Sequence, residues 1–259
     1  MAKAIIIVSF GTTNLDGLKV MEDFEDEIRE YFNGRYKVCK AFTSRSIANI
    51  LFNKHGKIVP RLEEVLFNLS NDGYREVYIQ PLHIIEGREY LSILNTIKEY
   101  SYSFLKLTLG NVIMGNNENE IIEGCNLIVD SMEKELDKNQ NLVLVGHGSK
   151  TINTESYNYL RNIFMERGFK NVFLGTLEGE KKKDEILKEL IKNEITDISL
   201  LPILMLPGNH IVRDIFGGKN SWQSIFLENN ISVNPIKKSL LEYTIIREFY
   251  LCLISSNIR

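Results

Sequence analysis

The chain has 259 residues and a formal net charge of −3 at pH 7. Hydrophobic residues make up 44% of it and charged residues 25%, which is the ordinary composition of a packed globular protein. Binding to phosphate groups needs a basic surface, so this slightly acidic balance argues against a nucleic-acid partner and against an anionic membrane surface.

No apolar run approaches the roughly 20 residues that a membrane-spanning helix needs, and the run near the N-terminus is too short for a signal peptide. We therefore expect a soluble, cytoplasmic protein. The three cysteines, Cys39, Cys125 and Cys252, lie far apart without a C-x-x-C pair. This spacing favours free structural thiols over a disulfide framework or a zinc knuckle.

Short apolar runs alternate with helical patterns along the whole chain, and eight of these runs are expected to be strands. In the first half the expected strands cover residues 4–8, 36–41, 76–82 and 104–109. In the second half they cover residues 141–145, 171–174, 197–201 and 231–235.

Apolar residues at helical spacing fill the stretches between these strands. One helix ends at Gly34, and a second begins after Pro60 and ends at Gly73. The remaining helices are expected over residues 89–100, 118–136, 154–167, 183–193, 221–229 and 240–253. His55 is expected in an exposed loop.

Strands that alternate with helices imply parallel sheets covered on both faces. Because the order of elements repeats, we expect an α/β fold of two similar Rossmann-like domains, each with a four-stranded parallel sheet flanked by helices. The expected domains are residues 1–137 and 138–259, with the C-terminal helix free to pack back on the first domain.

The two halves also repeat in their residues. Three pairs of segments match: 6–12 with 143–149, 81–89 with 202–210 and, more weakly, 41–44 with 175–178. In this alignment Phe10 corresponds to His147, Ser44 to Glu178 and Glu89 to His210.

Three polar side chains, His147, Glu178 and His210, follow three separate strands of the second half. With a strand order of 2-1-3-4 these strands are neighbours, and their loops meet at the carboxyl edge, where open parallel sheets bind ligands. Two imidazoles and a carboxylate that leave positions open suit a catalytic metal. The sequence therefore predicts a metal site in the second domain.

The residues alone leave structural alternatives open. A histidine between two glycines, as at His147, is also typical of a tight loop; His210 also suits a helix cap, and Glu178 a surface turn. Glu89 suits the first turn of a helix, although its match to His210 favours a position facing a cleft. His83 ends a strand and is expected to be buried.

Several nucleotide and hydrolase signatures are absent from the sequence. There is no P-loop, no G-x-G-x-x-G after the first strand and no G-x-S-x-G elbow. We therefore expect no ATP, no NAD and no covalent hydrolase chemistry.

The chain resembles the single-subunit, ATP-independent cobaltochelatases of anaerobic cobalamin biosynthesis, which are relatives of ferrochelatases. Five segments spread over most of the chain carry the resemblance: residues 8–12, 41–44, 79–90, 145–148 and 207–210. It implies the chelatase-like duplication of the fold and an enzyme that inserts Co²⁺ into sirohydrochlorin or precorrin-2. A sirohydrochlorin ferrochelatase and a non-catalytic bilobal binder of metal or tetrapyrrole stay open as alternatives.

The resemblance also implies roles for individual residues. It makes His147 a metal ligand and proton acceptor, His210 a second ligand and Glu178 a residue that can complete the metal site. It makes Glu89 an acid that faces the cleft, and we expect Glu89 to be catalytic. The tetrapyrrole is expected to contact loops that follow the strands, where guanidinium groups can pair its carboxylates. The expected substrate-binding residues are Ser9, Phe10, Gly11, Thr12, Ser44, Arg45 and Arg88.

The expected partners are the tetrapyrrole and the divalent metal, without nucleic acid or membrane, and the oligomeric state is left open. No cofactor is expected beyond the metal substrate, which is Co²⁺, with Fe²⁺ or Ni²⁺ as substitutes in vitro. Imidazole is a good ligand for all three ions.

Overall fold

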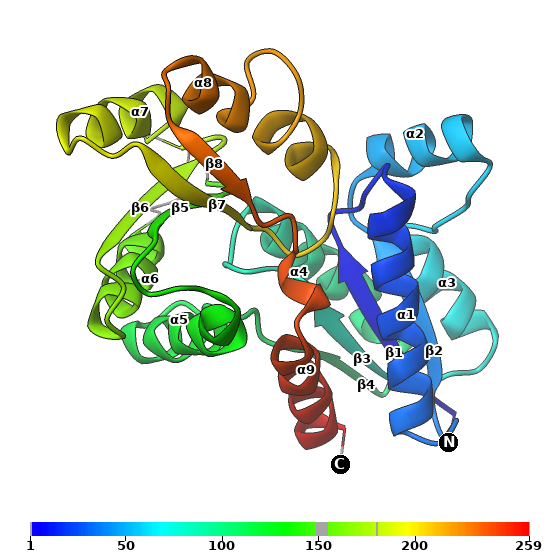
Figure 1. The fold of residues 1–259 in the computed structure, drawn as a ribbon. Coiled ribbons are helices and arrows are strands. Elements are labelled where there is room, and N and C mark those ends of the chain that lie inside the picture. Colours follow the sequence, from blue (N-terminus) through cyan, green and yellow to red (C-terminus); the bar gives the residue numbers. More distant parts are fainter. Residues whose placement is uncertain (1, 149–154, 180, 259) are drawn as a thin grey trace. The chain divides into compact units, whose positions relative to one another are not determined.

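The structure, a computed structural model, describes residues 2–148, 155–179 and 181–258 (Figure 1). Residue 149, the last of the repeat segment 143–149, and residue 154, the first of the expected helix 154–167, lie outside these ranges. The chain divides into unit 1, Met1–Gly115 with Arg247–Arg259, and unit 2, Asn116–Ile246. Each unit contains one four-stranded parallel sheet, which confirms the expected α/β fold of two similar domains. Within the described ranges no helix combines the length and the apolar character needed to cross a bilayer.

The sheet of unit 1 has the strand order β2-β1-β3-β4. Its strands are β1 (Lys3–Ser9), β2 (Lys37–Phe42), β3 (Glu76–Pro81) and β4 (Lys106–Leu109), all within two residues of the expected bounds. The apolar run of β1 is buried on both faces, as is typical of a central strand in a parallel sheet.

Helices cover both faces of this sheet (Figure 1). They are α1 (Leu15–Tyr31), α2 (Arg45–His55), α3 (Leu62–Asn71), α4 (Arg88–Tyr100), the short η1 (Ser101–Ser103) and α9 (Thr244–Asn257). Ile6 and Val8 of β1 pack in one cluster with residues of α3 and α4. On the other face the rings of Phe24 in α1 and Tyr250 in α9 pack at a tilt of 52°, with their centroids 6.1 Å apart.

Helix α2 is missing from the sequence prediction, which placed His55 in a loop. The structure makes His55 the last residue of α2, and Gly56 closes the helix with a φ of 65°. Leu51 is the one residue of α2 that is buried, so the helix has no need of a strong apolar pattern in its sequence. The pair of caps, Ser44 before the helix and Gly56 after it, is the signal that predicts this helix.

The sheet of unit 2 has the order β6-β5-β7-β8, the same topology as in unit 1. Its strands are β5 (Asn141–Gly146), β6 (Asn171–Thr176), β7 (Asp197–Ile203) and β8 (Ser232–Pro235). Its helices are α5 (Glu118–Met132), η2 (Glu133–Glu135), α6 (Glu155–Glu166), α7 (Lys183–Lys192), η3 (His210–Ile215), α8 (Trp222–Glu228) and η4 (Leu240–Glu242).

The boundary between the units lies at Gly115, earlier than the expected boundary at residue 137. The reason is α5, which packs against α6 of unit 2, where the Cys125 thiol lies 3.6 Å from the Ser156 carbonyl oxygen. From Arg247 onward α9 belongs to unit 1.

His83 follows β3, and neither of its ring nitrogens has a hydrogen-bond partner among the described residues. Burial lowers the pKa of His83 from the usual 6.5 to about 4. A buried imidazole without partners stays neutral because charging it would cost solvation energy.

We predict that His83 makes unit 1 less stable as the pH falls from about 6.5 to about 4. In this pH range His83 is protonated in the unfolded chain but stays neutral in the folded chain. The free energy of unfolding therefore decreases by up to about 1.4 kcal/mol for each pH unit by which the pH falls. Chemical denaturation of His83→Leu across this range should lack that part of the slope. His55→Leu, which removes an exposed histidine of the same unit, is the matched control, and an unchanged slope in His83→Leu contradicts the prediction.

Candidate metal centre

Close packing fixes the turn that carries His147 at the end of β5. A Cβ on Gly146 would lie 2.6 Å from the ring of Tyr157. Gly148 has a φ of 73°, and a Cβ there would lie 2.6 Å from the Cβ of Thr176. Only glycine fits on both sides of His147, so this turn brings the histidine backbone directly against its neighbours.

Tyr157 of α6 packs against this turn, a contact that was not predicted from the sequence. Its hydroxyl hydrogen-bonds with the backbone of Gly148 and His147, and its burial raises the pKa above the usual range. The phenol therefore stays neutral at physiological pH. An aromatic residue on an amphipathic helix predicts core packing, and nothing in the sequence indicates this contact.

Backbone hydrogen bonds join the loop after β6 to the loop after β5. The amide of Leu177 donates to the Gly146 carbonyl at 3.0 Å, and the amide of Glu178 donates to the His147 carbonyl at 2.8 Å. The Glu178 side chain itself is exposed. The structure therefore brings Glu178 next to His147 through the backbone.

Unit 1 repeats these bonds at the matching positions. The amide of Thr43 donates to Ser9 at 2.9 Å, and the amide of Ser44 donates to Phe10 at 3.1 Å. Gly11 has a φ of 115°, in the left-handed range like its counterpart in unit 2. The predicted correspondence of Phe10 with His147 and of Ser44 with Glu178 thus agrees with the backbone structure.

His210 opens η3, a π-helical turn that begins seven residues after β7. Its ring Nδ1 lies 2.6 Å from Oδ2 of Asp214, one turn further along. Ile211 and Ile215 are buried and attach the turn to the core of unit 2. Asp214 is absent from the sequence prediction, although the spacing of four residues from a histidine could have indicated it.

The rings of His147 and His210 lie edge to face, with centroids 5.0 Å apart and an interplanar angle of 86°. Nδ1 of His147 lies 3.1 Å from the Gly148 carbonyl oxygen. Because carbonyl and carboxylate oxygens only accept, Nδ1 is the donor in both histidines, and in the neutral imidazole Nε2 then has a lone pair. Two imidazoles that bind one ion through Nε2 at about 2.1 Å have centroids about 5 Å apart, so this spacing fits a shared ion.

A complete set of three ligands is not assembled among the described residues, in which no three His, Cys, Asp or Glu side chains form a group that could hold a metal. The two histidine rings lie together, but the exposed side chain of Glu178 does not complete such a group with them. The role of Glu178 as a ligand stays a prediction.

The predicted residues of unit 1 lie at the carboxyl edge of its own sheet. Glu89, in the first turn of α4, accepts a hydrogen bond from the Thr43 hydroxyl at 2.8 Å. Phe10 is 42% exposed although it is aromatic, and Arg45 and Arg88 are exposed as well. These four residues are accessible to a ligand.

Other predicted substrate-binding side chains of unit 1 serve the fold. The Ser9 hydroxyl is buried and points to the sulfur of Met21 at 3.5 Å. The buried Thr12 hydroxyl accepts a hydrogen bond from the amide of Asn14 at 3.1 Å. The Ser44 hydroxyl caps α2. At these positions the side chains are engaged, and substrate contacts there would have to come from the backbone.

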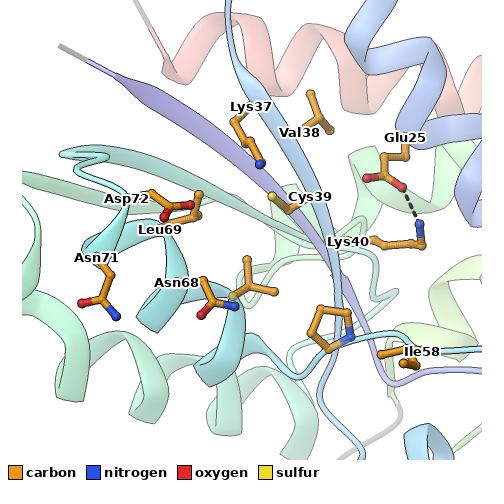
Figure 2. Close-up of a pocket in the computed structure, with 12 residues that line it drawn as sticks. Glu25, Lys37, Val38, Cys39, Lys40, Ile58, Asn68, Leu69, Asn71 and Asp72 are labelled. Carbon is orange, nitrogen blue, oxygen red and sulfur yellow. Dashed lines mark hydrogen bonds and ion pairs between the residues drawn. The ribbon is translucent and has the colours of Figure 1, made fainter. Parts of the chain in front are cut away.

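A cavity of about 460 Å³ lies elsewhere in unit 1, between the edge strand β2 and one face of α3 (Figure 2). Cys39 lies in it, and the ion pair of Lys40 with Glu25, 2.8 Å long, lies at its wall (Figure 2). Burial raises the pKa of the Cys39 thiol, so the thiol stays protonated and is a poor metal ligand. None of the residues predicted to bind metal or substrate lines this cavity.

We predict that Gly148→Ala destabilises unit 2 more than Gly168→Ala does. Both glycines have a positive φ, which costs an alanine about 1–2 kcal/mol. Only at Gly148 does the new Cβ also collide, because the nearest atom to a Cβ at Gly168 is 3.8 Å away on a lysine side chain. Denaturation curves of the two variants measure the difference, and equal losses would show that the turn around Gly148 yields easily.

Two similar proteins carry the name sirohydrochlorin cobaltochelatase. The one from Salmonella typhimurium is 27% identical over 252 residues, covering 96% of this chain and 94% of its own length. The one from Nitratidesulfovibrio vulgaris, with the suffix CbiKC, is 26% identical over 247 residues, covering 93% of this chain and 85% of its own length.

Solved structures of chelatases share the fold. SirB from Bacillus subtilis with Fe³⁺ has a TM-score of 0.66 at 16% identity, with 99% of this chain and 95% of that chain covered. CbiX, described as the terminal enzyme for biosynthesis of siroheme in denitrifying bacteria, has a TM-score of 0.59 at 10% identity, with 99% and 100% covered. The family described as cobalt chelatase (CbiK) matches residues 3–259, so the chain belongs to this family and is a metal chelatase.

Proposed function

We propose that this protein inserts Co²⁺ into sirohydrochlorin, with His147 and His210 as ligands of the incoming ion. The observation that carries the proposal is the histidine pair, whose rings are 5.0 Å apart and whose Nδ1 atoms both have acceptors. The names of the two relatives, which cover almost the whole chain, support the choice of metal and of tetrapyrrole.

Insertion exchanges one divalent ion for two pyrrole protons, so the site needs groups that release metal and accept protons. When the ion passes to the macrocycle, Nε2 of His147 and Nε2 of His210 regain their lone pairs, so each imidazole can accept one of the two protons. This order assigns to His147 the double role of ligand and proton acceptor. Holding the ion and the macrocycle together supplies proximity without an external energy source.

The remaining predicted residues have supporting roles in this proposal. Glu178, on the loop bonded to that of His147, supplies a third ligand. Glu89, held by Thr43, is the catalytic carboxylate of unit 1. Arg45 and Arg88, both exposed, pair the carboxylates in which sirohydrochlorin is rich.

Turnover tests the proposal directly. Under anaerobic conditions, the protein with sirohydrochlorin and Co²⁺ should change the tetrapyrrole absorption spectrum faster than a mixture without enzyme. His147→Ala should reduce the rate to that of the mixture without enzyme, because ligand and proton acceptor are lost together. His55→Ala, which changes an exposed histidine of α2, should keep the wild-type rate. A wild-type rate in His147→Ala removes this residue from the mechanism, and stoichiometric binding without turnover identifies a binding protein.

Metal choice needs its own comparison, because imidazole also binds Fe²⁺ and Ni²⁺ and the order of affinities does not identify the substrate. We expect the highest kcat/KM with Co²⁺ when the three ions are compared on one tetrapyrrole under one set of conditions. A higher kcat/KM with Fe²⁺ would make the protein a ferrochelatase and leave the histidine pair unaffected.

A further inference from the structure

We infer that Asp214 is a positioning residue for metal capture, which holds the His210 imidazole so that Nε2 faces the incoming divalent ion. This inference rests on the proposed function, since it requires His210 to be a metal ligand. Asp214 acts through His210 and makes no contact with the ion itself. Carboxylates behind metal-binding histidines fix the orientation of the ring and make it a stronger ligand.

The π-helical turn η3 creates the contact. Residues four apart lie more nearly in line in a π-helix than in an α-helix, because its turn is wider. The carboxylate of Asp214 therefore lies directly beside the ring of His210, and Oδ2 is 2.6 Å from Nδ1. Single π-helical turns occur frequently at functional sites.

The backbone beneath Asp214 is fixed by its neighbours. Ile211 and Ile215 are 3% and 0% exposed, and they bury the inner side of the turn in the core of unit 2. Behind it, a Cβ on Gly217 would lie 2.4 Å from the carbonyl oxygen of Arg213, so only glycine lets the chain pass this closely. The backbone position of Asp214 is thus fixed by the packing of its neighbours.

The contact between His210 and Asp214 adds little to the stability of the fold. The side chains of His210 and Asp214 are 43% and 52% exposed, and exposed pairs of this kind contribute little to the free energy of folding. Removing Asp214 should therefore leave the fold intact and reveal its effect on metal binding.

The two histidines differ in what holds their rings. His147 donates to the neutral backbone carbonyl of Gly148, whereas His210 donates to the carboxylate of Asp214. A side-chain substitution can remove the second partner and not the first. His210 is therefore the histidine of the pair whose orientation depends on a single replaceable group.

Calorimetric titration of the full-length protein with Co²⁺ alone tests the inference. Asp214→Asn keeps the shape of the side chain and removes its charge, and it should weaken Co²⁺ binding about 10- to 100-fold with an unchanged melting temperature. Asp184→Asn is the matched control, because it removes an exposed acid from the first turn of α7 in the same unit. It should bind Co²⁺ as the wild type does.

A double-mutant cycle separates positioning from a general effect of negative charge. In the His210→Ala background, adding Asp214→Asn should leave the Co²⁺ affinity unchanged, because Asp214 acts only through the ring. A further loss in the double variant, or wild-type affinity in Asp214→Asn while His210→Ala binds weakly, overturns the inference alone. Wild-type affinity in His210→Ala overturns the proposed metal site itself.

Discussion

The hydrogen bond from the Glu178 amide to the His147 carbonyl joins two strand-end loops, and the position of the loop that carries His147 depends on it. The turn at His147 has a fixed shape because glycines flank it and Tyr157 packs beneath it. The same turn aims the Gly148 carbonyl at the imidazole and so determines which ring nitrogen is free. Backbone geometry, more than any side-chain contact, therefore orients this histidine.

The two units show what such a backbone frame permits. Both sheets have the same strand order, and both join their first two strand-end loops with the same pair of amide-to-carbonyl bonds. Unit 1 places the exposed ring of Phe10 where unit 2 places His147, and Glu89 where unit 2 places His210. The duplicated frame thus carries the pair of histidines in one copy and Phe10 with Glu89 in the other, because side chains at loop ends can change without disturbing the sheet.

The histidine pair is held unequally, and this inequality is a property of the two loops. In the tight turn at His147, the carbonyl of Gly148 lies close enough to accept a hydrogen bond from the ring. After His210 the carbonyl of the next residue, Ile211, already accepts a hydrogen bond from the amide of Phe216 at 3.0 Å. The acceptor for the His210 ring is instead the side chain of Asp214. In both arrangements Nδ1 makes the hydrogen bond, so Nε2 of each neutral ring can act as a metal ligand, as two histidines that share one ion require.

The amino-acid sequence by itself determined the eight strands, their pairing into two sheets and the positions of His147, His210, Glu178 and Glu89, because buried parallel strands are continuous apolar runs and their loops meet at one edge. It did not determine helix α2, which buries only Leu51 and so lacks a periodic pattern. Nor did it determine the support of His147 by Tyr157 or of His210 by Asp214. Tertiary structure decided these contacts, because each depends on how an element packs. Tyr157 reaches the turn because α6 packs against the loop that carries His147. Asp214 reaches His210 because η3 is a π-helical turn that is attached to the core by Ile211 and Ile215.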